Sequence, residues 1–133
     1  IVGSTAFNLL VSRRGLRYFL AERAFADATK VTDGLIDACY CTSHQAGARH
    51  APASFVGGDL NLSIRETYPA LTQPVAIVWG REAKITPVSD ANRFIQSRPQ
   101  TRLKVIERCC LLPHVEQAEE FVGYAKATLA GVK

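Results

Sequence analysis

The chain has 133 residues, of which 47% are hydrophobic and 21% charged, so it is long enough for one domain with a buried core and too apolar to be disordered. Its 16 basic and 12 acidic residues give a net charge of +4, without the long basic stripe that marks nucleic-acid-binding proteins. No apolar run reaches the roughly 20 residues that cross a bilayer, so we expect no nucleic-acid partner and at most peripheral membrane contact.

The first half of the chain reads as helical. Two short helices are expected over residues 4–12 and 14–23, followed by a third over "VTDGLIDACYCTSHQ" with Thr32 as its N-cap. Leu35, Ile36, Cys39 and Tyr40 recur at helical spacing and form its predicted buried stripe. The segment "GARHAPASFVGG" predicts a further helix that Pro52 shifts and two glycines end, and "SIRETYPAL" predicts a turn or a short helix.

The second half changes character at Gln73. The apolar run "PVAIVW" predicts a strand that is covered on both faces, as in a parallel sheet. Thr86 followed by Pro87 predicts the start of a helix, "RLKVIER" predicts a second strand, and "VEQAEEFVGYAKATLAG" predicts an amphipathic helix. That helix is expected to have acidic residues near its N-terminus (Glu116, Glu119 and Glu120) and a buried face (Phe121, Tyr124, Ala125 and Leu129).

This order of strand, helix, strand and helix implies a right-handed parallel crossover. A sheet of two parallel strands buries too little apolar surface to be stable alone. We therefore expect the chain to be part of a larger sheet, completed by another polypeptide or by a larger assembly.

The cysteines stand in two close pairs, and their spacing suits neither a metal site nor a disulfide framework. They are Cys39, Cys41, Cys109 and Cys110. A composite zinc site that also uses His44 and His114 is the alternative. Free thiols in a reducing compartment are the favoured interpretation, with no metal and no cofactor.

The segment "PVAIVWGREAKITPVSDANRFIQSRPQTRLKVIERCCLLPHVEQAEEFVGYAKATL" resembles the C-terminal third of an α/β-hydrolase. In that superfamily the penultimate major strand ends in a Gly-x-x-Asp loop, and the last strand leads to a Gly-His turn. The resemblance implies an α/β fold made of the C-terminal part of that architecture. Residues 1–45 would then be a cap-type helical segment and residues 46–133 the C-terminal part of the core. "HQAGARHAPASFVGGDLN" is similar to a cyanobacterial and plastid subgroup, which implies the plastid stroma or the cyanobacterial cytoplasm.

The catalytic residues of the superfamily are replaced at the matching positions. Counting from Gly80, the acid position is Ala83, and counting back from "PH", the base position is Leu111. A catalytic triad needs an imidazole as base and a carboxylate to orient it, and neither of these side chains supplies such a group. Glu82 and His114 are the weak substitutes, and no Gly-x-Ser-x-Gly nucleophile motif occurs in the chain.

The ligand-pocket candidates are Trp79, Cys110 and His114. Cys109 and Cys110 are read as small thiols that fill a vacated pocket, and a small apolar ligand is expected there. Two functions remain open. The favoured one is a non-catalytic hydrolase-like protein that acts as a binding or assembly subunit. The other is an active serine hydrolase for acyl substrates, whose nucleophile and other catalytic groups lie outside this chain.

Overall fold

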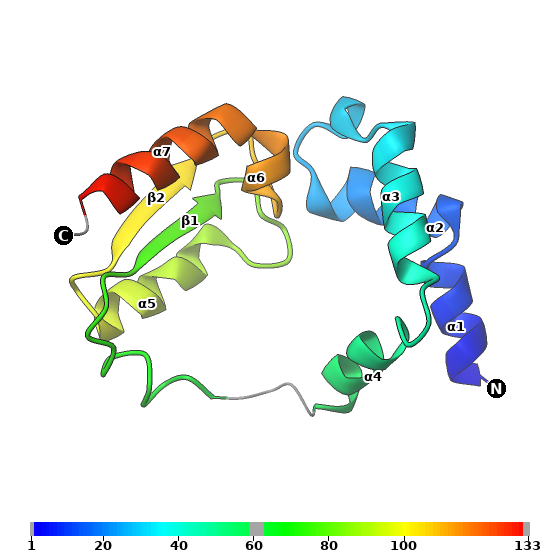
Figure 1. The fold of residues 1–133 in the computed structure, drawn as a ribbon, viewed down its shortest axis with the longest axis horizontal. Coiled ribbons are helices and arrows are strands. Elements are labelled where there is room, and N and C mark those ends of the chain that lie inside the picture. Colours follow the sequence, from blue (N-terminus) through cyan, green and yellow to red (C-terminus); the bar gives the residue numbers. More distant parts are fainter. Residues whose placement is uncertain (1, 59–62, 132–133) are drawn as a thin grey trace.

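The computed structural model describes residues 2–58 and 63–131, and within them it has a helical half and a half of mixed strands and helices (Figure 1). The helical half contains α1 (Val2–Leu10), α2 (Arg13–Phe19), a π-helical turn (Leu20–Ala24), a 3-10 turn (Ala28–Lys30), α3 (Asp33–Ser43) and α4 (His50–Gly57). The mixed half contains β1 (Ala76–Gly80), a 3-10 turn (Val88–Asp90), α5 (Ala91–Ser97), β2 (Arg102–Ile106), α6 (Pro113–Glu116) and α7 (Ala118–Ala130).

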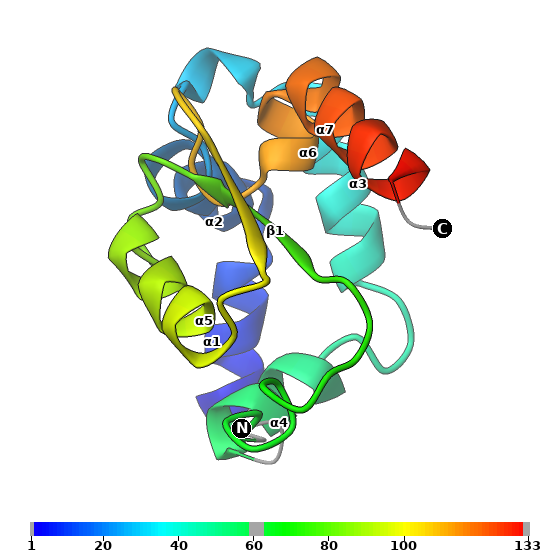
Figure 2. The same ribbon diagram turned by 90° about the vertical axis from the view of Figure 1, so that its left-hand side faces the viewer.

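The sheet that these residues form has two parallel strands, in the register Ala76 opposite Arg102 and Gly80 opposite Ile106. Helices α5 and α7 lie on opposite faces of the sheet, as the two perpendicular views show (Figures 1 and 2). The predicted parallel crossover is therefore present. The expectation that the first strand is covered on both faces is wrong for these residues, because only Gly80 of β1 is buried and Ala76 is exposed.

The helical half has its own core, in which Leu20, Ala24, Phe25, Val31 and Ile36 pack together. Leu111 and Leu112, from the loop after β2, pack against this cluster and tie the two halves together. The backbone N–H of Leu111 also donates to the carbonyl of Ala24 at 2.9 Å.

Several local predictions are confirmed. The Thr32 side chain caps α3 by accepting from the N–H of Leu35 at 3.2 Å, and Ile36 from the predicted stripe is buried. Helix α4 starts at His50, so Pro52 lies in its first turn, where a missing N–H costs no helical hydrogen bond. Residues 65–70 form turns, as expected.

Other local predictions are wrong. Thr86 does not cap a helix; its carbonyl accepts from the Trp79 Nε1–H at 2.8 Å, and a 3-10 turn after Pro87 leads into α5. The second N-terminal helix changes to a π-helical turn at Leu20. The predicted C-terminal helix is divided at Gln117, whose backbone angles (φ −133°, ψ 55°) are not helical.

Two residues of that C-terminal helix are also placed differently from the prediction. Leu129 is 72% exposed, because no described element packs against its flank of α7. Glu116 is 2% exposed instead of lying at a solvated helix end. No helix in the described ranges combines the length and the apolar character needed to span a bilayer.

Candidate functional site

The loops that follow β1 and β2 meet at the carboxyl ends of the two strands. The N–H of Arg81 donates to the carbonyl of Ile106 at 2.9 Å, and the N–H of Glu82 donates to the carbonyl of Cys109 at 3.0 Å. The approach is so close that a Cβ at Gly80 would lie 1.9 Å from the carbonyl oxygen of Cys110. Glycine at this position is therefore a condition for the loops to meet.

A small pocket of about 170 Å³ opens where the loops meet. It is lined by Val78, Trp79, Gly80, Ala83, Thr86, Cys110, Leu111 and Pro113. Ala83 and Leu111, the two positions read from the sequence as acid and base, thus lie at one pocket, together with Trp79 and Cys110. The lining is mostly apolar, and its only side-chain groups with a hydrogen on oxygen or sulfur belong to Thr86 and Cys110.

Glu82, one of the two substitutes, has its carboxylate engaged away from this pocket. Its Oε1 accepts from the N–H of Arg108 at 3.2 Å, and its Oε2 accepts from the N–H of Cys109 at 2.8 Å. The side chain thereby holds the loop after β2 in place. It is absent from the pocket lining.

His114, the other substitute and the third pocket candidate, lies outside the lining. Its ring packs edge-on against Phe121, with 6.0 Å between the ring centroids. The structure thus brings Trp79 and Cys110 together at the pocket but not His114.

The two adjacent thiols are buried and engaged. The Cys110 Sγ–H donates to the carbonyl of Arg23 at 3.2 Å. Burial, reinforced by the nearby Glu116 carboxylate, raises the pKa of the Cys109 thiol to about 12. Cys109 is therefore protonated at neutral pH and is a poor nucleophile.

Glu116 is buried, and its carboxylate accepts from three backbone N–H groups, while the Lys30 Nζ donates to its backbone carbonyl. Its Oε1 accepts from the N–H groups of Ala26 at 2.6 Å and Asp27 at 3.0 Å, and its Oε2 accepts from the N–H of Cys110 at 2.8 Å. One buried carboxylate thus joins the helical half to the pocket loop. The sequence showed only a glutamate near a helix start, and nothing local in it indicated partners 89 and 90 residues away.

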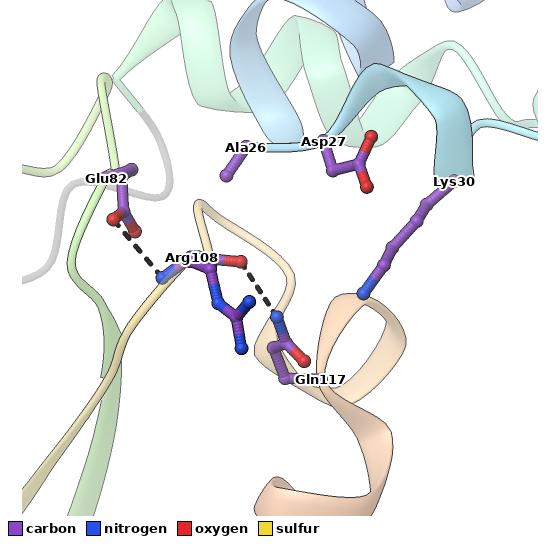
Figure 3. A pocket seen from close by; sticks show the side chains of 6 residues that line it. All are labelled: Ala26, Asp27, Lys30, Glu82, Arg108 and Gln117. Carbon is purple, nitrogen blue, oxygen red and sulfur yellow. Dashed lines mark hydrogen bonds between the residues drawn. The ribbon is translucent and has the colours of Figure 1, made fainter.

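A second cavity of about 480 Å³ is lined by Ala26, Asp27, Lys30, Glu82, Arg108 and Gln117 (Figure 3). Arg108 has a left-handed backbone (φ 52°), which costs a non-glycine residue about 1–2 kcal/mol. Glu82 and Gln117 hold this conformation, because Gln117 Nε2 donates to the Arg108 carbonyl at 2.9 Å. The hydrogen bonds from Thr29 lower the pKa of Asp27.

The described residues contain no group of three or more His, Cys, Asp or Glu side chains placed to hold a metal ion. All four cysteines are free, and they lie in two separate places. Cys39 and Cys41 are on α3, and Cys109 and Cys110 are in the pocket loop. The alternative of a composite zinc site is therefore not formed by these residues.

No protein-family model matches the sequence. The structure is similar to a mutant of the meta-cleavage product hydrolase CumD, with 26% identity and a TM-score of 0.71 over 86% of this chain and 44% of that chain. It is also similar to CumD from Pseudomonas fluorescens in complex with acetates, with 26% identity and a TM-score of 0.72 over the same shares of the two chains. The similarity to CarC, a serine hydrolase involved in carbazole degradation, has 19% identity and a TM-score of 0.77 over 90% of this chain and 48% of that chain.

The chain thus spans less than half the length of these hydrolases. The similarity covers 86–90% of this chain, which has two parallel strands, helices on both faces of the sheet and a helical half before them. The chain has the fold of the C-terminal part of an α/β-hydrolase.

Proposed function

We propose that the protein is a non-catalytic α/β-hydrolase-like subunit that binds a small apolar ligand or a protein partner. The observation that carries this proposal is the composition of the small pocket. Ala83 and Leu111 both line it, and neither has a group that donates or accepts a proton. A hydrolase of this type needs a base and a carboxylate at its reacting centre.

The positions of the substitutes also support the proposal. Both carboxylate oxygens of Glu82 are occupied by backbone N–H groups of the neighbouring loop. The His114 ring packs on Phe121 instead of lining the pocket. Recruiting either group would require a rearrangement of the loop that holds the pocket together.

The second candidate is an active serine hydrolase that acts on acyl substrates. The names of the similar structures favour it, since CumD and CarC are hydrolases about twice as long as this chain. In this reading the nucleophile, the base and the acid come from outside the chain. Residues 1–45 serve as a cap-type segment in either reading, and the partner completes the sheet at β1.

A fluorophosphonate that labels activated serines separates the two candidates. The 133-residue chain is purified natively with whatever remains bound to it, treated with the reagent, and compared with an active meta-cleavage product hydrolase as the positive control. We expect no labelling in any band of the natively purified assembly. Labelling that disappears after heat denaturation would instead establish the active hydrolase.

Ligand binding has a built-in reporter, because Trp79 is the single tryptophan of the chain and lines the pocket. A dry apolar cavity of roughly 150 Å³ is large enough for benzene. We expect benzene to change the Trp79 emission saturably, and Ala83→Leu to remove the change by filling the pocket. Ala70→Leu, at an exposed position, is the matched control. A linear, unsaturable response in the unmodified chain would count against the pocket as a binding site.

The four free thiols support a reducing compartment. We place the protein in the plastid stroma or the cyanobacterial cytoplasm. Fluorescence microscopy of a tagged chain in its native cells tests this placement.

A further inference from the structure

The second cavity is lined by charged side chains that the proposed function does not use. The basic ones are Lys30 and Arg108, and the acidic ones are Asp27 and Glu82. Its volume of about 480 Å³ lies within the range of about 300–1,000 Å³ that is typical of small-molecule sites. It has no lining residue in common with the apolar pocket, so the two can be assigned and tested separately.

The walls of this cavity come from both halves of the chain and are joined by the chain's own hydrogen bonds. The N–H groups of Ala26 and Asp27 donate to the Glu116 carboxylate, and the Lys30 Nζ donates to the backbone carbonyl of the same residue. None of the six lining residues lies on β1 or α7. The described residues therefore form this cavity without the free edge of the sheet.

Both acidic side chains of the cavity are held by groups other than its basic side chains. The two carboxylate oxygens of Glu82 accept from the N–H groups of Arg108 and Cys109. The Oδ1 of Asp27 accepts from the N–H of Thr29 at 2.9 Å and from its hydroxyl at 2.6 Å. Neither carboxylate forms an ion pair within the described ranges.

The Arg108 guanidinium is consequently the largest unused set of donors in the cavity. It forms no hydrogen bond or ion pair with a described residue, and it has five N–H donors in a planar fork. Figure 3 shows its side chain extending from the loop toward Gln117, while Lys30 reaches in from the helical half. Two cationic groups thus border a space that no described carboxylate fills.

The backbone of Arg108 gives a second reason to assign a ligand to this side chain. Its φ of 52° lies in the left-handed region, which glycine adopts freely and arginine only at a cost. Hydrogen bonds from Gln117 to its carbonyl and from its N–H to Glu82 hold it there. Such strained residues gather at ligand sites, where the surroundings fix a side chain in the position that binding needs.

We propose that this cavity binds the carboxylate group of a small organic acid between Arg108 and Lys30. The guanidinium fork matches two carboxylate oxygens with two parallel N–H···O bonds, and the ammonium group supplies a second positive charge. Asp27 and Glu82 balance these two charges, so the lining has no net charge. A doubly charged phosphate would therefore leave more negative charge uncompensated than a singly charged carboxylate.

Titration of the 133-residue chain with sodium propionate, followed by NMR at constant ionic strength, tests the proposal. We expect saturable shifts of the Arg108 Nε–H and of the Gln117 side-chain amide, with a dissociation constant in the millimolar range. Propionamide has nearly the same shape without the charge, so it should give no saturable shift. Inorganic phosphate should bind more weakly than propionate.

Four variants separate the side chain from the fold. Arg108→Lys keeps the charge but loses the fork, so the dissociation constant for propionate should rise about tenfold. Arg108→Gly should abolish saturable binding while the chain becomes more stable, because glycine adopts φ 52° without strain. Asp27→Asn keeps an oxygen for Thr29 and removes a negative charge, so it should tighten binding about threefold. Arg14→Lys, at an exposed position on α2, is the matched control and should stay within about twofold.

Absence of saturable propionate binding to the unmodified chain would overturn the proposal. Equal binding of propionamide, tighter binding of phosphate, or unchanged affinity in Arg108→Gly would overturn it as well. The fluorophosphonate and benzene measurements do not involve this cavity, so the proposed function stands or fails independently of these results.

Discussion

The buried carboxylate of Glu116 offers the sharpest test of how the two halves of the molecule are joined. It accepts three backbone hydrogen bonds, from Ala26, Asp27 and Cys110. In Glu116→Gln, one oxygen becomes an NH₂ group that faces an N–H donor. One hydrogen bond is lost, one buried donor is left unpaired, and the other two bonds lose their charge assistance.

Hydrogen bonds to charged groups contribute about 1.5–3 kcal/mol each, and an unpaired buried donor costs about 1–3 kcal/mol. We therefore expect the free energy of unfolding to fall by about 3–5 kcal/mol, a large share of the roughly 5–15 kcal/mol typical of a domain. Chemical denaturation followed by Trp79 emission measures the change. Glu119→Gln, at an exposed position, is the control and should stay within about 0.5 kcal/mol of the unmodified chain.

Hydrogen exchange locates the effect. The amides of Ala26, Asp27 and Cys110 should lose protection in Glu116→Gln more than amides of α3, because each of the three donates to this carboxylate. A loss of stability below about 1 kcal/mol would refute the reasoning. Unchanged exchange at all three amides would refute it as well.

Three further changes have definite expected outcomes. Gly80→Ala should lower the free energy of unfolding by more than about 3 kcal/mol, because its Cβ would overlap the Cys110 carbonyl. Gly34→Ala is the control: its Cβ would have no atom nearer than 4.0 Å, so it should raise the free energy of unfolding by about 0.5–1 kcal/mol in the same denaturation assay. Arg108→Gly should stabilise by about 1 kcal/mol, because glycine adopts φ 52° without strain; no gain would contradict this. The pKa of Cys109 is raised from 9.0 to about 12, so the folded state keeps this proton while the unfolded state loses it. Its contribution to the free energy of unfolding should be intact below pH 9 and fall by up to about 1.4 kcal/mol per pH unit from there towards pH 12. Between pH 8 and 11, the free energy of unfolding should therefore depend less steeply on pH in Cys109→Ala than in the unmodified chain, and identical slopes would contradict the assignment.

The sequence by itself determined the features that depend on near neighbours in the chain. Thr32 caps α3 because its hydroxyl needs only an amide three residues away. The apolar run at 74–79 and the alternating segment at 102–108 predicted strands, because alternation and β-branching are properties of the strand itself. The resemblance to an α/β-hydrolase also assigned Ala83 and Leu111 to the acid and base positions, each counted within its own loop, before their common pocket was visible.

Only the tertiary structure decided the features that depend on distant segments. Thr86 failed as a cap because its carbonyl is held by the Trp79 indole, and Leu129 is exposed because no described element covers its flank. The role of Glu116 depends on amides that the fold brings from the other half of the chain. A local pattern states which groups a residue has, but burial and long-range hydrogen bonds decide which of them are used.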